Sequence, residues 1–144
     1  HQMCPTDYVI SGDTIIEFEN KIIGKPDSKN DAFEVLKSLS GKSHYVISAL
    51  SLTFYDSQIT IFDSTKVSFK VLDKKTIQFY IDNFNVLDKA GSYNIEDADE
   101  YFIKNIDGCY YNIVGFPEKK FLKSEIKNIL DALWFFTINI KSLE

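Results

Sequence analysis

Two short segments near the start of the sequence contain residues whose types are suited to phosphate chemistry. Asp13 follows Gly12 between apolar stretches that favour β-structure, so its carboxylate could orient a water molecule or bind a metal. Lys25 lies between Gly24 and Pro26, where the glycine permits a close approach of the backbone to a phosphate. Turn carboxylates and solvated turn lysines are common as well. Taken alone, these residues leave catalytic and structural interpretations open.

Residues for other common catalytic sites are scarce. The two histidines are His1 and His44, and we interpret His44, inside a predicted strand, as structural, since lone histidines are usually packed or hydrogen-bonded. A Ser-His-Asp triad and a His-rich metal site are therefore poorly supported. Cys4 and Cys109 form no CxxC pair, which predicts reduced thiols in a cytoplasmic protein. No Walker-type loop or GxGxxG motif is present.

The composition is that of one globular domain, which we expect to span residues 1–144. Hydrophobic residues make up 44% and charged residues 26% of the sequence, and the formal net charge is −5. No lysine-rich run and no long apolar run stands out, so we expect neither a nucleic-acid nor a membrane partner. All 16 basic residues are lysines. A bound phosphate would therefore be held by lysine, backbone N–H groups or a metal rather than by arginine.

The hydrophobic pattern predicts an α/β or α+β domain with helices and strands of ordinary length. The predicted strands are Tyr8–Ile10 and Thr14–Ile16, interrupted at Ser11–Asp13, then His44–Tyr55 pairing with Gln58–Phe62, then Val67–Val71 and Cys109–Val114. The predicted helices begin at Ser28, which we expect to act as an N-cap, at Lys75 and at Phe121, and they end near Gly41, Phe84 and Ile140. Asn85–Gly91 is expected to be a loop. The apolar residues around Trp134 and Phe136 could form a dimer surface or cover the sheet.

Several motifs occur in the order and at the spacing typical of one enzyme family. They are Asp13-Thr14, Gly24-Lys25-Pro26, Leu39-Ser40-Gly41, His44-Tyr45-Val46, Thr65 to Phe69, Tyr80, Asp88 to Tyr93 and Gly115-Phe116-Pro117. From about Tyr8 to about Phe121, the chain therefore resembles the Maf family of nucleoside triphosphate pyrophosphatases.

The resemblance implies both a fold and an activity. The expected fold is α/β, like that of inosine triphosphate pyrophosphatases, with a long bent mixed sheet flanked by helices. The expected reaction is hydrolysis of a nucleoside triphosphate to the monophosphate and pyrophosphate, which removes modified or surplus nucleotides. The resemblance also implies a divalent metal, usually Mg²⁺, a cytoplasmic location and a homodimer.

The resemblance assigns roles to individual residues. Asp13 matches the family's proposed proton acceptor, and Lys25 and Lys89 match lysines near the phosphates. Thr14 and Glu96 fall where the family has residues that influence the choice of base. The resemblance assigns no metal ligand in this sequence.

The sequence departs from the family pattern in two places. The Ser-x-Ser-x-Arg-Arg loop with which the family begins is not found, so we expect an N-terminally incomplete domain that lacks the first strand, loop and helix. A catalytically impaired Maf-like module for nucleotide binding or dimerisation is the alternative. Thr14 matches the dTTP and UTP branch, whereas Glu96 matches the 7-methyl-GTP branch. Glu96 could accept from the two donors of guanine, or it could belong to a solvated acidic loop with Asp97, Asp99 and Glu100.

Overall fold

The computed structural model describes the backbone of residues 8–141 and the side chains as far as Leu133. Four residues named above are affected by these limits. His1 and Cys4 lie outside the described residues, and so do the side chains of Trp134 and Phe136. The expectations made for these residues stay predictions.

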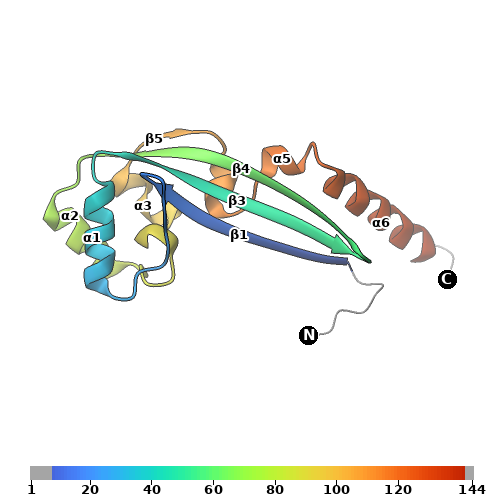
Figure 1. Cartoon of the computed structure of the whole chain (residues 1–144), viewed down its shortest axis with the longest axis horizontal. Coiled ribbons are helices and arrows are strands. Elements are labelled where there is room, and N and C mark those ends of the chain that lie inside the picture. Colours follow the sequence, from blue (N-terminus) through green and yellow to red (C-terminus); the bar gives the residue numbers. More distant parts are fainter. Residues whose placement is uncertain (1–7, 142–144) are drawn as a thin grey trace.

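One antiparallel sheet forms the body of the molecule (Figure 1). Its strands are β1 (Tyr8–Phe18), β2 (Lys21–Ile23), β3 (Ser43–Phe54), β4 (Ser57–Phe69) and β5 (Ile103–Asp107), in the spatial order β2-β1-β3-β4-β5. The long strands β1, β3 and β4 run from the end that carries most of the helices to the opposite end (Figure 1). The expected α/β class is confirmed. All strand pairs in the described residues are antiparallel, where the resemblance implied a mixed sheet.

Tight turns join neighbouring strands. Glu19 and Asn20 connect β1 to β2 with φ angles of 52° and 62°, which suits a hairpin turn that follows the twist of the strands. The pairing predicted for the segments on either side of Asp56 is confirmed, because β3 pairs with β4 from Ser43↔Ser68 to Phe54↔Ser57. β4 continues without a break as far as Phe69. The strand predicted to begin at Val67 is therefore the last part of β4.

Helices cover one face of this sheet. They are α1 (Lys29–Leu39), α2 (Lys74–Asn83), α3 (Ile95–Phe102), α4 (Tyr110–Val114), α5 (Glu118–Phe121) and α6 (Glu125–Lys141), with the 3₁₀ turn η1 (Ala90–Ser92) before α3. The predicted cap of α1 is confirmed, since Ser28 Oγ accepts a hydrogen bond from Asp31 N at 3.1 Å. α2 follows its prediction to within one residue at each end. None of the helices in the described residues could span a membrane.

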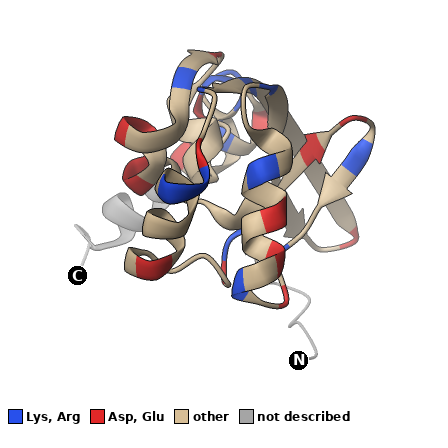
Figure 2. Ribbon diagram, turned by 90° about the vertical axis from the view of Figure 1, so that its left-hand side faces the viewer, with Lys and Arg blue, Asp and Glu red and all other residues tan. Residues whose placement is uncertain are grey.

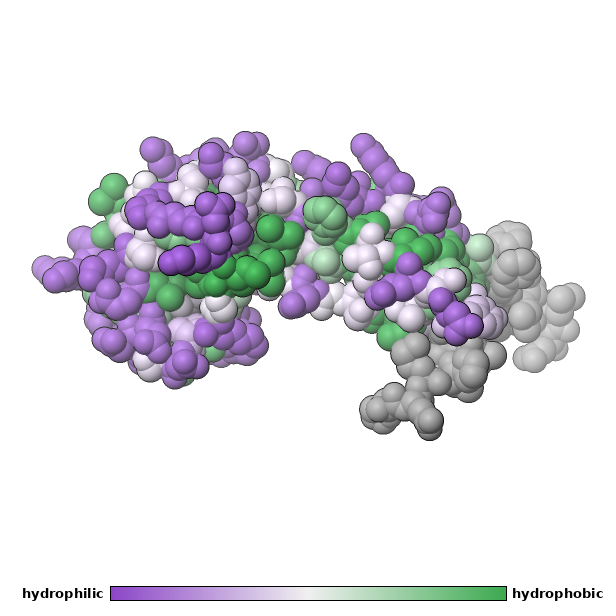
Figure 3. Space-filling model, viewed as in Figure 1, coloured by the Kyte–Doolittle hydropathy of each residue, from purple (hydrophilic) through white to green (hydrophobic). Residues whose placement is uncertain are grey.

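The core consists of two clusters on the same face of the sheet. Alternate residues of β3 are buried, as expected for a strand covered on one side. The larger cluster joins one end of the sheet to α1, α2, α3 and α4. The smaller cluster joins the other end to α6 and contains Leu50, Leu52 and Ile126. Apolar side chains also lie exposed at the middle of the molecule, between these ends (Figure 3).

Charged residues of both signs are interspersed on the helices at the larger end (Figure 2). Exposed ion pairs join Lys37 to Glu34 on α1 at 3.0 Å and, between two turns, Lys42 to Glu19 at 2.9 Å. Exposed pairs of this kind contribute little to stability. They make a solvated outer surface around the cavity described below.

Two predicted elements near the site differ from the structure. The interruption predicted at Ser11–Asp13 is wrong, because Gly12 and Asp13 continue the ladder opposite Leu50 and Ala49. The strand predicted for Cys109–Val114 is also wrong, because residues 110–114 form α4. The side chain of Asn112 is fully buried and donates to Val46 O and Thr65 Oγ1. These tertiary bonds override the β-propensity of the Tyr and Ile residues around Asn112.

Two further segments were predicted incompletely. The helix predicted to begin at Phe121 begins at Glu125 as α6, Phe121 is the last residue of the short helix α5, and Ser124 Oγ accepts from Lys127 N at the start of α6. α3 and β5 lie where no element was predicted. Asn94 caps α3 and accepts from Glu96 N, and Ile95, Ala98 and Phe102 form its buried face.

Candidate active site

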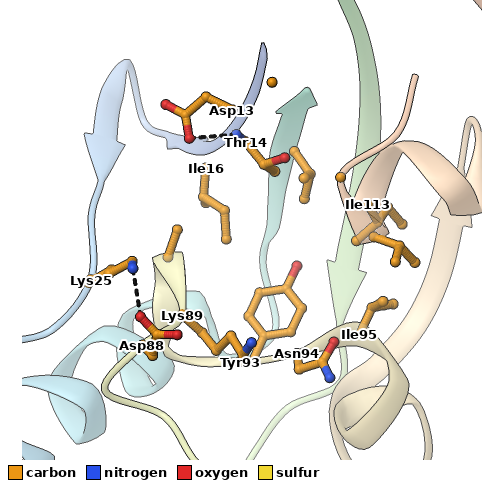
Figure 4. A pocket seen from close by; sticks show the side chains of 15 residues that line it. Asp13, Thr14, Ile16, Lys25, Asp88, Lys89, Tyr93, Asn94, Ile95 and Ile113 are labelled. Atoms are coloured by element: carbon orange, nitrogen blue, oxygen red, sulfur yellow. Dashed lines mark hydrogen bonds and ion pairs between the residues drawn. The ribbon is translucent and has the colours of Figure 1, made fainter. Parts of the chain in front are cut away.

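A cavity of about 430 Å³ opens on the helix-bearing face of the sheet, beside the larger core cluster (Figure 4). Its lining comes from the middle of β1, the loop after β2, the segment that leads from Asp88 into α3, and the end of α4. These segments are far apart in the sequence, and the antiparallel sheet brings them together. The position agrees with the general rule that ligand cavities lie where several elements meet.

One end of the cavity is mainly apolar. Its walls include Ile16, Val46, Tyr93, Ile95 and Ile113. The Thr14 side chain comes from β1 and lies on this side of the cavity (Figure 4). This end could therefore bury a flat apolar or weakly polar group, with Thr14 as a directional contact.

The other end of the cavity is charged. Lys25 Nζ donates to Asp88 Oδ1 at 2.6 Å, and both side chains are more than 60% exposed. The hydrogen bond from Lys25 is the largest cause that holds the pKa of Asp88 below its usual value. Lys89 also lines this end (Figure 4). Two cations next to an open cavity are suited to an anionic ligand.

A backbone bond joins the two loops that carry these lysines. Gly91 N donates to Gly24 O at 3.1 Å. Gly91 has a φ of 68°, and a Cβ atom at this position would lie 2.4 Å from Ile16 Cδ1. The glycine in the Asp88 to Tyr93 motif therefore lets the loop approach both β1 and the loop after β2.

Asp13 lies at the edge of β1, beside the cavity. It pairs with Ala49 while Thr14 pairs with Ser48, so strand alternation turns the two side chains to opposite faces of the sheet. Asp13 Oδ1 accepts a hydrogen bond from Thr14 N at 2.9 Å. β2 pairs only with Ile16, Glu17 and Phe18, and no other strand among the described residues covers this edge. The carboxylate is thus exposed at the rim of the cavity (Figure 4).

A buried network of polar side chains lies behind the cavity wall. Ser48 Oγ contacts Thr14 Oγ1 at 2.8 Å and donates to Asn112 O at 2.6 Å. Asn112 Nδ2 donates to Val46 O at 3.0 Å and to Thr65 Oγ1 at 3.1 Å. Ser48, Thr65 and Asn112 are each fully buried. The network links β1, β3, β4 and α4, and so fixes the wall that carries Thr14.

Tyr93 connects the cavity to a buried histidine. His44 Nε2 lies 2.7 Å from the Tyr93 hydroxyl, and the His44 ring also contacts Phe69 edge to face. Burial lowers the pKa of His44 from 6.5 to about 4, so the imidazole is neutral at pH 7. Burial also raises the pKa of Tyr93, so the phenol keeps its proton. The structural interpretation of His44 is confirmed, since it packs below the Tyr93 wall.

Glu96 lies apart from the other predicted residues. It is exposed in the first turn of α3, and it is absent from the described lining of the cavity, although Asn94 and Ile95 belong to it. Desolvation, and then the charges of Glu96 and Asp99, raise the pKa of Tyr110. The acidic residues named with Glu96 lie on the helix α3 rather than in a loop, with Asp99 and Glu100 exposed and Asp97 half-buried.

The residues at the cavity fit a divalent cation that is bound together with a ligand. Within the described residues, no group of three or more His, Cys, Asp and Glu side chains could hold a metal by itself. Mg²⁺ usually takes one or two carboxylates, with phosphate oxygens and water completing its octahedron. Asp13 and Asp88 are the carboxylates among the lining residues. This donor set is suitable for a cation that arrives with a phosphate.

The structure therefore brings four of the five predicted residues to one cavity, namely Asp13, Thr14, Lys25 and Lys89. Sequence reasoning assigned no role to Ser48 or Asn112. Alternation along the strand His44–Tyr55 places Ser48 on the buried face, and this was the available signal for it. No signal identified Asn112, because its segment was predicted as a strand.

Comparison with known proteins gives a family match. A family model described as Maf-like protein matches residues 1–125. A dTTP/UTP pyrophosphatase of Thermosipho africanus is 40% identical over 126 residues, which are 88% of this chain and 62% of that protein. A dTTP/UTP pyrophosphatase of Clostridium botulinum (strain Hall) is 45% identical over 117 residues, 80% of this chain and 60% of that protein.

A third relative extends the comparison to another group of bacteria. The dTTP/UTP pyrophosphatase of Bacteroides thetaiotaomicron is 38% identical over 128 residues, 88% of this chain and 66% of that protein. The chain thus spans about three fifths of the length of the curated relatives that it matches.

Proposed function

The chain belongs to the Maf family, and on that premise we propose that its cavity binds a nucleoside triphosphate and promotes hydrolysis to the monophosphate and pyrophosphate. The observation that carries the proposal is the polarity of the cavity. Lys25 and Lys89 lie at one end, and apolar side chains such as Ile95 and Ile113 lie at the other. The names of the relatives support dTTP or UTP as substrate.

This polarity gives the nucleotide a direction. The triphosphate carries several negative charges, and lysines are its main cationic partners in a chain without arginine. The base would enter the apolar end, where Tyr93 and the isoleucines exclude water. Thr14 would then face the base, and Lys25 would face the phosphates.

Asp13 is the proposed group for activation of water. β2 pairs with the edge of β1 that faces away from β3, and Lys25 lies two residues after the end of β2. Carboxylate and lysine therefore lie along the same edge of β1 (Figure 4). From this position Asp13 would orient a water molecule and accept its proton as the water attacks the α-phosphorus, and pyrophosphate would leave. The lysines would stabilise the charge on the leaving group.

A divalent cation, which we propose to be Mg²⁺, would complete the site. The Asp13 carboxylate would hold it together with phosphate oxygens, since the Asp88 carboxylate already accepts from Lys25 Nζ. Bound there, it would supply neutralisation of the phosphate charge. The homodimer, the cytoplasmic location and a role of Glu96 in base choice stay predictions.

One observation favours a second candidate, a module that binds nucleotides without hydrolysing them. The Asp13 carboxylate accepts from the backbone of Thr14 and lies on the other face of β1 from the Thr14 side chain. A carboxylate held in this way would not activate the water, and the cavity would bind a nucleotide without hydrolysing it. The experiment below separates the two functions because it measures both quantities.

The experiment measures pyrophosphate release from UTP and dTTP with Mg²⁺, and nucleotide binding by calorimetry with UMP, for the wild type and for Asp13→Asn. Asparagine keeps an oxygen that can accept from Thr14 N, so the local backbone bond is retained. We expect Asp13→Asn to lower kcat by about 100-fold or more and to change the affinity for UMP little. EDTA should abolish release in the wild type.

Asp63→Asn is the matched control. Asp63 Oδ1 accepts from Ser64 N at 3.0 Å, which is the same local bond on β4, and Asp63 does not line the cavity. We expect the control to keep wild-type kcat. Pyrophosphate release that survives Asp13→Asn would reject the assignment of Asp13. UMP binding without any release by the wild type would favour the second candidate.

A further inference from the structure

The hydroxyl of Ser48 has two partners that determine the direction of its hydrogen bonds. Ser48 Oγ lies 2.6 Å from the backbone oxygen of Asn112 and 2.8 Å from Thr14 Oγ1. A carbonyl oxygen can only accept, so the single proton of Ser48 goes to Asn112 O. Ser48 therefore has only lone pairs left for Thr14.

The direction of the next bond follows. Because Ser48 Oγ cannot donate to Thr14, the 2.8 Å contact requires that Thr14 Oγ1 donates to Ser48. The one proton of the Thr14 hydroxyl is then committed to the interior of the protein. Toward the cavity, the hydroxyl presents lone pairs alone. The two bonds of Ser48 therefore fix the Thr14 hydroxyl as an acceptor toward the cavity.

Buried contacts maintain this direction. Ser48 and Asn112 are each 0% exposed. The Asn112 side chain is held by Val46 O and Thr65 Oγ1, and its backbone oxygen also accepts from Gly115 N at 3.2 Å. Turning the proton of Ser48 toward Thr14 would break the 2.6 Å bond to Asn112 O in a fully buried site. The direction is thus a property of the fold.

The Thr14 hydroxyl is accessible because residue 115 is a glycine. Gly115 lines the cavity with a φ of 115°, and a Cβ atom there would lie 3.4 Å from Thr14 Oγ1. Ile113 and Val114, from the same turn of α4, also line this part of the cavity. In Figure 4, Thr14 lies toward Ile113, and Lys25 and Asp88 lie at the opposite side.

We propose that Ser48 is a positioning residue that makes Thr14 an obligate hydrogen-bond acceptor, so that this end of the cavity selects the ring imide N–H of a uracil- or thymine-type base. The proposal rests on the proposed function. Phosphate oxygens at neutral pH are acceptors, so an acceptor-only hydroxyl disfavours them and directs the triphosphate to the lysines. Cytosine carries a lone pair where uracil carries N3–H, so the same hydroxyl disfavours cytosine.

The first test uses the wild-type protein with four ligands. Affinities for UTP, CTP, dUTP and N3-methyl-UTP are measured by calorimetry with Ca²⁺ in place of Mg²⁺. We expect UTP and dUTP to bind alike, and CTP and N3-methyl-UTP to bind about tenfold more weakly or worse. Equal binding of UTP and N3-methyl-UTP would overturn the proposal and leave the proposed function intact. If dUTP binds more weakly than UTP while N3-methyl-UTP binds as well as UTP, Thr14 contacts the ribose and not the base. This result would also overturn the proposal.

The second test uses Ser48→Ala. In this variant the Thr14 hydroxyl loses its fixed acceptor and can rotate to donate toward the ligand. We expect the UTP to CTP affinity ratio to fall to within about threefold of unity, with CTP binding improved. If Ser48 contributes only to stability, the variant should bind UTP and CTP more weakly by the same factor. An unchanged UTP to CTP affinity ratio would therefore overturn the proposal.

Ser51→Ala is the matched control. Ser51 lies on β3 like Ser48, but outside this cavity, and its Oγ lies 2.6 Å from Thr60 Oγ1 of β4. The Ser51→Ala substitution therefore removes a cross-strand hydroxyl pair without touching Thr14. We expect it to keep the wild-type ratio. If Ser48→Ala does not fold, the wild-type ligand series still tests the acceptor role of Thr14, because equal binding of UTP and N3-methyl-UTP overturns the proposal. Failure of every nucleotide to bind the wild type would overturn the proposed function, and this inference with it.

Discussion

Lys25 Nζ lies 2.6 Å from Asp88 Oδ1, although 63 positions separate the two residues in the sequence. The contact joins the loop after β2 to the loop before η1, and the backbone bond between Gly91 N and Gly24 O joins the same loops a few residues away. Both partners of the ion pair are largely exposed, so the pair contributes little to folding. Its consequence is positional, because it holds the lysine at the mouth of the cavity.

Removal of the Lys25 charge should weaken nucleotide binding and turnover. Lys25→Gln keeps most of the side-chain length but loses the cation that the phosphates would contact. A hydrogen bond to a charged group contributes about 1.5–3 kcal/mol, so we expect kcat/KM for UTP to fall by about 10- to 100-fold. The rate of pyrophosphate release at several UTP concentrations gives kcat/KM. The melting temperature of the variant should stay close to that of the wild type.

Lys37→Gln is the control for the Lys25 variant. Lys37 forms a similar exposed ion pair with Glu34 at 3.0 Å, but it lies on α1 and does not line the cavity. We expect wild-type kcat/KM for this variant. Equal losses in the two variants would show that the Lys25 effect arises from net charge and not from its position.

His44 makes the stability of the protein sensitive to mild acid. Its pKa is lowered by burial from 6.5 to about 4, so the unfolded chain binds the proton more strongly than the folded chain. The stabilisation is complete above pH 6.5 and is lost as the pH falls toward 4. The expected loss between pH 7 and pH 5 is about 2 kcal/mol, measured by urea unfolding.

The His44→Gln variant tests the origin of this loss. Its unfolding free energy should change less between pH 7 and pH 5 than that of the wild type. Asp73 and Asp88 also have lowered pKa values, but from a starting value of 3.8, so they titrate below this window. If the variant does not fold, an NMR titration of the wild-type His44 ring supplies the answer, and a midpoint near 6.5 would contradict the prediction.

Gly108 should be intolerant of any side chain. Its φ is 142°, and a Cβ atom would lie 2.7 Å from Thr65 Oγ1 and 3.0 Å from Thr65 Cα. The Thr65 hydroxyl accepts from Cys109 N and Asn112 Nδ2, so its displacement disturbs the network behind the cavity. We expect Gly108→Ala to cost about 3 kcal/mol, measured by chemical unfolding.

Gly24→Ala is the contrasting substitution. No atom lies within 4 Å of a Cβ built at Gly24, and its φ is not positive. The stability of this variant should equal or slightly exceed that of the wild type, because alanine restricts the unfolded chain. A similar loss in both variants would contradict the explanation given for Gly108.

Much of the fold could be predicted from local patterns. Ser28 and the helical spacing of Leu36 and Leu39 located α1, and the strand predicted for His44–Tyr55 matches the central strand β3. The helix α4 could not be predicted, because a tertiary contact formed by Asn112 decides it. The same holds for β1, where pairing of Gly12 with Leu50 carries the strand through a segment that resembles a turn.

The part of the candidate site that could be predicted from the sequence consists of residues in the ordered motifs. Asp13, Thr14, Lys25 and Lys89 stand in short motifs, and they meet at one cavity. Alternation could place Ser48 on the buried face, but it could not assign Ser48 or Asn112 to the site, because both side chains are fully buried and neither lines the cavity. The role proposed for Ser48 depends on hydrogen-bond direction, which a sequence pattern does not encode.

The opposite orientations of Asp13 and Thr14 make the length of β1 as important as its composition. Both residues take their sides from the strand alone, since Thr14 pairs with Ser48 and Asp13 with Ala49. One residue added or removed between this pair and the hairpin at Asn20 would exchange the two sides. The carboxylate would then enter the apolar end, and the hydroxyl would move to the rim. The number of residues between this pair and the hairpin is therefore a requirement of the site, in addition to the identities of Asp13 and Thr14.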